Sequence, residues 1–178
     1  MKLSGLLAVL LAVIPAAAVA AAEKPPPACP LLKAADIDAA LGIEVGEAHE
    51  TDVVIPSGPA KGETMTGCMW GIGTKGMINI SLIRTGPAAT RDAGIAKLRE
   101  GIERLKAKGW QHQETIIGGT HCGTLVPPKE QAEHLPVAVG CMAEARGWAI
   151  GVSAMIAKTQ VAPEKVKALF DAAVARLP

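Results

Sequence analysis

Apolar residues alternate with small or polar residues in several short stretches of the chain. Residues 78–82 and 150–154 carry an apolar side chain at every second position, which is the period of a strand with one buried face. Further strands are predicted near residues 52–55, 111–117 and 121–126. Because successive side chains of a strand point to opposite faces, we expect these strands to share one sheet with a single buried side.

Three other stretches repeat their apolar residues with the period of an α-helix. A short helix is expected over residues 33–41, where Gly42 ends it, and a longer one over residues 88–107, which Gly109 caps. A third helix is expected over residues 163–176. The apolar stripes of the two longer helices consist of Ile95, Leu98, Ile102 and Leu105, and of Val166, Phe170, Ala173, Val174 and Leu177.

Two segments of the chain are similar to each other. Residues 66–69 and 139–142 both contain Gly-Cys-Met, and each is followed by a turn with a basic residue and glycine, at residues 75–76 and 146–147. An alternating strand and one of the longer helices come next in both cases. The pattern predicts two equivalent strand-turn-strand-helix units, with chance similarity as the alternative. If the units are equivalent, both apolar stripes cover the same face of the sheet.

The fold class that follows is α+β, with an antiparallel sheet of six or seven strands and helices packed on one face. Residues 56–63 and 127–136 are rich in proline or charge and are expected to be loops. Residues 29–178 are too few for two domains with separate cores, so we expect a single domain.

The N-terminal residues have the layout of a secretory signal peptide. Lys2 precedes an apolar run over residues 6–14, and small residues that offer Ala-x-Ala cleavage sites extend to Ala22. The run is too short for a comfortable membrane span, although a retained N-terminal anchor is the alternative. Residues 1–22 are therefore assigned to the signal peptide, and the proline-rich residues 23–28 to an extended tether.

Export changes what charge and composition imply. Lys2 is the only basic residue of the signal peptide, so the 18 basic and 17 acidic residues of the whole chain become equal in number after cleavage. No polybasic segment remains to favour nucleic acid or an anionic membrane. Because the chain has no Tyr and one Phe, aliphatic residues and methionines are expected to fill the core. The three tryptophans, Trp70, Trp110 and Trp148, are expected to be buried.

The four cysteines are expected to oxidise in an exported domain, and three pairings are possible. If the strands on either side of loop 127–136 pair directly, Cys122 faces Cys141 at a distance that suits a disulfide. This pairing leaves Cys29 for Cys68. A Cys29–Cys68 disulfide would attach the N-terminal tether and first helix to the sheet.

A short pattern near the N-terminus supports this interpretation. It consists of Cys-Pro-Leu-Leu at residues 29–32, Ala-Asp-Ile at 35–37, Ala-Leu-Gly at 40–42 and Cys-Met-Trp at 68–70. Over residues 29–70 the chain resembles small secreted or lipid-anchored bacterial proteins, many of them known only as domains of unknown function. The resemblance implies an exported α+β domain with a first-to-second cysteine bridge and no particular chemistry. Prolines stand where a lipobox would need aliphatic residues, so we expect no stable membrane anchor.

No stretch carries a motif specific enough to name a reaction. The four histidines, His49, His112, His121 and His134, lack the spacing of helical metal ligands, although His112 and His121 lie on neighbouring predicted strands and can approach each other. A catalytic thiol at Cys122, activated by His121, would require that cysteine to stay unpaired. We therefore predict no catalytic residue, no metal ligand and no cofactor.

The sequence favours an exported, non-enzymatic binding module, periplasmic or secreted, for a protein partner or a small apolar ligand held between sheet and helices. The alternative is an inhibitor of an exported enzyme that presents the disulfide-braced loop 127–136, and an enzyme is less favoured. The sheet face opposite the helices discriminates among these classes. A continuous apolar concavity favours ligand binding, a flat polar face with a protruding loop favours inhibition, and clustered histidines and carboxylates favour catalysis.

Overall fold

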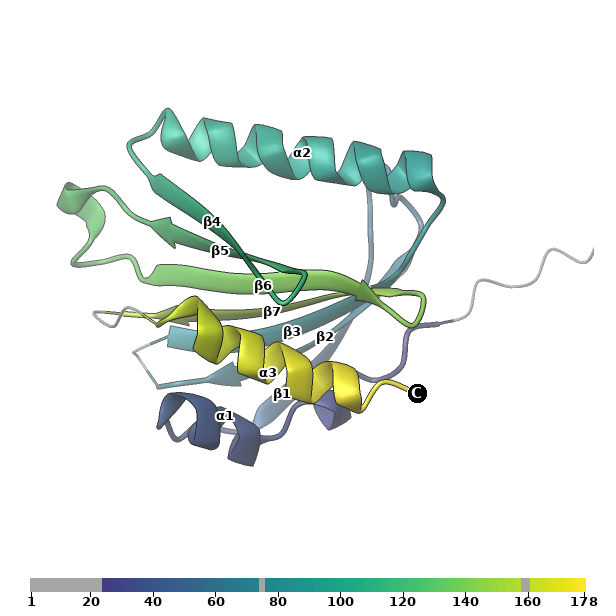
Figure 1. Cartoon of the computed structure of the whole chain (residues 1–178), viewed down its shortest axis with the longest axis horizontal. Coiled ribbons are helices and arrows are strands. Elements are labelled where there is room, and N and C mark those ends of the chain that lie inside the picture. Colours follow the sequence, from purple (N-terminus) through teal and green to yellow (C-terminus); the bar gives the residue numbers. More distant parts are fainter. Residues whose placement is uncertain (1–23, 74–75, 158–160) are drawn as a thin grey trace, which may run out of the picture.

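The computed structural model of the chain describes residues 24–73, 76–157 and 161–178 (Figure 1). The predicted signal peptide, residues 1–22, and Lys75 of the first predicted turn lie outside the described residues. The elements in chain order, with η for a 3-10 helix, are η1 (Cys29–Leu31), α1 (Ala34–Leu41), β1 (Ala48–Val54), β2 (Thr64–Gly71), β3 (Gly76–Arg84), α2 (Ala88–Lys106), β4 (Gln111–Ile117), β5 (Thr120–Val126), η2 (Lys129–Gln131), β6 (Val137–Ala145), β7 (Trp148–Ile156) and α3 (Pro163–Ala175).

The strands form one antiparallel sheet of seven strands in the order β1-β2-β3-β7-β6-β5-β4. The predicted fold class is thereby confirmed. The two similar hairpins, β2–β3 and β6–β7, meet at the centre of the sheet, where Ile80 pairs with Val152. Their cysteines also take equivalent places, because Cys68 pairs with Ile80 in one hairpin and Cys141 pairs with Val152 in the other. The two hairpins are therefore related by an approximate twofold axis between β3 and β7.

The β6–β7 turn shows how local sequence sets this geometry. Arg146 and Gly147 are the two residues between Ala145 and Trp148, which pair with each other. Their φ angles are 51° and 82°, the left-handed conformation that a type I′ hairpin turn requires at both central positions. Gly118 and Gly119, with φ angles of 56° and 81°, make the same kind of turn between β4 and β5. Turns of this type match the twist of the strands they join.

One face of the sheet carries the core. The alternating residues Ile78, Ile80 and Leu82 of β3 are buried, and so are Ile150, Val152 and Ala154 of β7. Because these residues occur at paired positions of adjacent strands, they form one continuous apolar layer. Helix α3 covers the part over β5, β6 and β7 with the buried residues Val166, Leu169, Phe170 and Ala173. The predicted common buried side of the two strands is confirmed.

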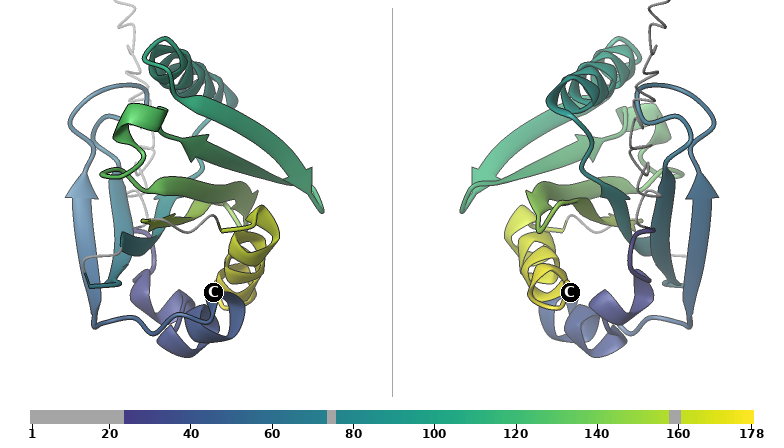
Figure 2. Two further views of the ribbon diagram at one scale, coloured as in Figure 1. Left: turned by 90° about the vertical axis from the view of Figure 1, so that its left-hand side faces the viewer. Right: turned by 90° about the vertical axis from the view of Figure 1, so that its right-hand side faces the viewer.

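Helix α2 corrects the prediction that both long helices cover this face. None of its residues is buried, and Ile95 and Leu98 of its apolar stripe are 49% and 47% exposed. The helix lies on the opposite side of the sheet from α1 and α3, as both views show (Figure 2). The N-terminal segment instead completes the core, through the buried side chains of Leu31, Leu32 and Ile37. Element η1 contacts β1 and β2, and α1 packs on α3.

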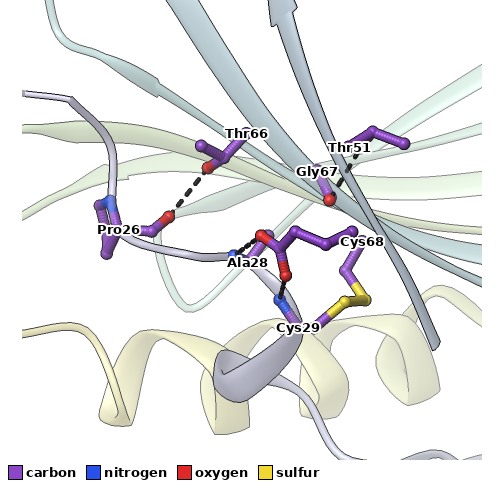
Figure 3. Close-up of a disulfide and its surroundings, with 8 residues drawn as sticks. Pro26, Ala28, Cys29, Thr51, Thr66, Gly67 and Cys68 are labelled. Atoms are coloured by element: carbon purple, nitrogen blue, oxygen red, sulfur yellow. Dashed lines mark hydrogen bonds between the residues drawn. A yellow bond between two sulfur atoms is a disulfide. The ribbon is translucent and has the colours of Figure 1, made fainter.

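The N-terminal segment is held by several bonds around one disulfide (Figure 3). Cys29 is bonded to Cys68 of β2, and the Glu50 carboxylate of β1 accepts hydrogen bonds from the backbone N–H groups of Ala28 and Cys29, the latter at 2.8 Å. The Thr66 hydroxyl donates to the Pro26 carbonyl at 2.9 Å. Residues 24–28, expected as a tether, thus lie against the sheet, with Ala28 fully buried.

Candidate functional site

The four predicted site cysteines form two disulfides. Cys29 is joined to Cys68 with a Cα–Cα distance of 4.9 Å, and Cys122 is joined to Cys141 with a distance of 4.0 Å. Cys122 and Cys141 are directly opposed on β5 and β6, in the strand register expected from the sequence. No cysteine is free, so none is a nucleophile or a metal ligand in this state. The disulfides are structural features and indicate an oxidising compartment.

The side of the sheet opposite α1 and α3, here called the open face, is the candidate functional site. Its residues alternate along each strand with those of the core, so its composition follows from the register. The described methionines all lie there: Met65, Met69, Met77, Met142 and Met155. None is buried, and Met142 is 49% exposed. The expectation that methionines fill the core is therefore wrong, because Ile, Leu, Val and two of the tryptophans fill it.

Small residues occupy the middle of the open face. One row across the sheet runs through Gly67, Ser81 and Gly151, and the next runs through Asn79, Ser153, Gly140 and Gly123. Most of these residues are partly exposed, although Gly67 is buried beneath the Thr51 side chain. The longer methionine side chains flank these rows, since Met69 pairs with Asn79 and Met142 pairs with Gly151. Methionine adapts to many shapes because it is unbranched and polarizable, which is why it is common at binding surfaces of broad specificity.

Helix α2 lies over this side of the sheet and is attached mainly at its ends (Figures 1 and 2). Before its first turn, the Thr85 N–H donates to the Gly147 carbonyl at 2.9 Å. Within that turn, Arg91 pairs with Glu144 of β6 at 3.1 Å. Beyond its last turn, the chain enters β4, which the helix contacts. Helix α2 therefore lies over the open face (Figure 2), and none of the residues of its apolar stripe is buried.

Ion pairs along α2 contribute to the stability of this exposed helix. Glu100 is paired with Lys97 at 3.2 Å and with Arg104 at 3.0 Å, and Glu103 with Lys106 at 2.8 Å. The hydrogen bond from Lys97, together with the charges of Lys97 and Arg104, keeps the pKa of Glu100 below its ordinary value. Pairs three or four residues apart stabilise a helix without help from tertiary packing.

A polar cluster marks the β4–β5 edge of the open face. His121 Nδ1 lies 3.0 Å from Glu114 Oε1, and the hydrogen bond to His121 is the main reason why the pKa of Glu114 is lowered. The charges of His121, His112 and Arg99 lower it further. The expected approach of His112 and His121 is thus realised around Glu114, whose participation the sequence reasoning missed. His49 lies on β1 at the opposite edge, and His134 lies in the loop after η2.

The tryptophans and surface hollows do not add a second site. Trp70 and Trp148 are 2% and 7% exposed, as expected, whereas Trp110 is only partly buried. One hollow is lined by Glu114, Thr124 and Pro163 among others, and another lies beside α1. Both are open to solvent. The candidate site is therefore a surface bordered by a helix.

Comparison of the chain with models of known protein families, with curated proteins and with solved structures finds no match. Within the described part of the chain, no helix is both long enough and apolar enough to cross a membrane.

Proposed function

We propose that the protein is an exported, non-enzymatic binding module that holds a small apolar ligand between α2 and the open face. One observation carries this proposal: five methionines lie unburied on the open face, while the helix above it has an apolar stripe and buries none of its residues. The signal-peptide pattern and the two disulfides support export to the periplasm or beyond.

The free energy available for binding comes from apolar surface that water now covers. Ile95 and Leu98 of α2 and Met142 of β6 are each about half exposed. Removing about 200 Å² of such surface from water contributes about 5 kcal/mol at about 25 cal/mol per Å², before the entropic cost of association is subtracted. A ligand that contacts both the helix and the sheet removes apolar surface of both from water. The movement of α2 that would admit the ligand is a rotation about the two attached ends of the helix.

A protein partner and an inhibitory role are less well supported. Loop 127–136 projects from one end of the sheet, as an inhibitory loop would (Figure 1). It is folded into η2 by turn hydrogen bonds such as Gln131 N–H to the Pro128 carbonyl at 2.9 Å. Leu135 is its one exposed large apolar side chain, and it is only 36% exposed. The loop therefore offers less apolar surface to a partner than the open face does.

Native mass spectrometry of the protein purified from its own host tests the proposal, because it detects a small molecule that is retained in the complex. A fluorescent fatty acid then serves as a defined apolar probe for titration. Leu98→Glu and Met142→Glu change half-exposed residues on the two sides of the proposed site, so they should preserve the fold. We expect each to weaken probe binding at least about tenfold, since a charge placed against an acyl chain is poorly solvated.

Val54→Glu is the matched control. Val54 is 63% exposed and lies on edge strand β1, on the side of that strand away from the open face. It should bind the probe as the unchanged protein does. Equal weakening in all three variants, or in none, would rule out the proposed site.

A further inference from the structure

The polar cluster at the β4–β5 edge has the composition and placement of a metal site. His112 and Glu114 are alternate residues of β4 and therefore project from the same face, about 7 Å apart along the strand. Glu114 is paired with Gly123 of β5, and His121 precedes Gly123 by two residues. His112, Glu114 and His121 thus surround one glycine on two neighbouring strands.

Gly123 provides the space that these side chains share. The ring of His112 lies over it, with Nε2 only 3.1 Å from the position that a β-carbon on Gly123 would occupy. A β-carbon there would require the imidazole to shift by a few tenths of an ångström, and a branched side chain would displace it further. On the other side, His121 Nδ1 is already in contact with the Glu114 carboxylate at 3.0 Å. A metal site here would require the half-buried His112 and the exposed Glu114 side chains to rotate, so that all three groups point toward one position above the glycine.

We propose that His112, Glu114 and His121 bind one divalent transition-metal ion, for which Zn²⁺ is the appropriate probe. Two imidazole nitrogens and one carboxylate oxygen are ligands that Zn²⁺ accepts at about 2.0 to 2.2 Å. Three protein ligands leave a fourth position for water or for a ligand atom. The site faces the same side of the sheet as the apolar surface, but it does not depend on the function proposed for that surface.

The positive charge of a neighbouring arginine should weaken metal binding, and this provides a further test. Arg99 of α2 lies near enough to Glu114 to help lower the pKa of that carboxyl group. Its positive charge disfavours a second cation at the same carboxylate. Neutralising Arg99 should therefore increase the affinity for the metal, whereas the loss of any of the three ligands should decrease it.

The other cluster of ligand-type side chains is not a competitor. Cys29, Glu50 and Cys68 have ligand atoms within 4.8 Å of one another. Both sulfurs are bonded in the disulfide, however, and the Glu50 oxygens accept two backbone N–H groups. In the oxidised protein these three residues have no free pair of ligands to offer.

Calorimetric titration of the chelator-treated, oxidised protein with zinc chloride near pH 7.5 tests the proposal. We expect one Zn²⁺ ion per chain. His112→Gln, Glu114→Gln and His121→Gln should each weaken binding by at least about tenfold, and Gly123→Val should do the same by displacing the His112 ring. Arg99→Gln should tighten binding about two- to fivefold. Unchanged melting temperatures of the apo variants establish that their folds are intact, and we expect them because none of the three ligand side chains is buried.

His49→Gln and His134→Gln are the controls, because they remove the two histidines outside the cluster. Both should bind zinc as the unchanged protein does. Imidazole resonances in ¹H–¹⁵N spectra should shift on zinc addition for His112 and His121 only. The absence of stoichiometric binding, or equal losses in the control variants, would overturn the proposal.

Discussion

Helices α2 and α3 follow equivalent hairpins, yet only α3 is packed against the sheet. Helix α3 buries Val166, Leu169, Phe170 and Ala173 against the sheet, whereas α2 buries no residue at all. Both have an apolar stripe at helical spacing. The difference shows that an amphipathic pattern indicates which side of a helix can be buried. The topology of the chain decides whether a free part of the sheet lies against that side.

The connection made by each helix explains the difference. Helix α2 must join β3 at the centre of the sheet to β4 at its edge, and so it must cross β7, β6 and β5. On the core face those three strands are covered by α3. The remaining core-face surface, over β1 and β2, is covered by η1, which the Cys29–Cys68 disulfide attaches there. The crossing therefore runs over the open face.

The largest effect should come from charges placed on the core face. Ile80→Asp and Val152→Asp replace residues that are 0% and 1% exposed at the central β3–β7 pair. Each should cost more than about 4 kcal/mol and unfold the domain, because the carboxylate has no partner there. Thermal unfolding followed by circular dichroism measures this.

The open face provides the matched controls for these variants. Ser81→Asp and Ser153→Asp alter the next residue of each strand, which points to the other side. Both should melt close to the unchanged protein. If Val152→Asp melted like Ser153→Asp, the assignment of the two faces would be wrong.

The two disulfides should contribute differently to the two halves of the sheet. Their sequence separations are 39 and 19 residues, so chain entropy predicts stabilisation of about 4 kcal/mol for Cys29–Cys68 and about 3 kcal/mol for Cys122–Cys141. Urea unfolding of the Cys29→Ser/Cys68→Ser and Cys122→Ser/Cys141→Ser double variants compares them. A larger loss from the second pair would contradict the central role given to the N-terminal attachment.

Truncation of one leucine in each helix tests the comparison directly. Leu169→Ala in α3 removes a side chain that is 1% exposed and should cost about 2 to 4 kcal/mol. Leu98→Ala in α2 removes one that is 47% exposed and should change the free energy of unfolding by less than about 0.5 kcal/mol. Similar losses in chemical denaturation would show that α2 packs more closely than described.

The smallest effect concerns the ion pair that links α1 to the end of α3, the two helices on the core side of the sheet. Arg176, which follows α3, holds the Asp36 carboxylate of α1 with bonds of 2.7 and 2.9 Å and also donates to the Leu31 carbonyl. The Arg176 hydrogen bond keeps the pKa of Asp36 below its ordinary value of 3.8. Asp36→Asn should cost about 1 kcal/mol at pH 7.

The pH dependence of this effect follows from the direction of the pKa shift. A carboxyl group with a lowered pKa in the folded state stabilises the fold above its ordinary pKa of 3.8, and this contribution is lost as the pH falls through the lowered folded value. The difference between Asp36→Asn and the unchanged protein should therefore vanish in acid. Asp171→Asn is the control, because Asp171 is 58% exposed and pairs only within α3. It should have a smaller effect at every pH.

Local patterns determined most of the secondary structure of this protein. The period of two in β3 and β7 predicted their shared buried side, and the spacing around loop 127–136 predicted that Cys122 would face Cys141. The first result depends only on the alternation within each strand, and the second on two consecutive strands whose register follows from counting residues across one loop. The helices were predicted for the same reason, since their period and their terminal residues are local features.

Only the tertiary structure decided what each surface meets. Sequence reasoning placed the methionines in the core and α2 over Ile80, and it did not anticipate that Glu50 would bond to the N-terminal segment. These outcomes depend on contacts between segments that are distant in the chain and on competition for one face of the sheet. A hydrophobic period indicates how apolar one side of a helix or strand is. It carries no information about which other segment of the chain packs against that side.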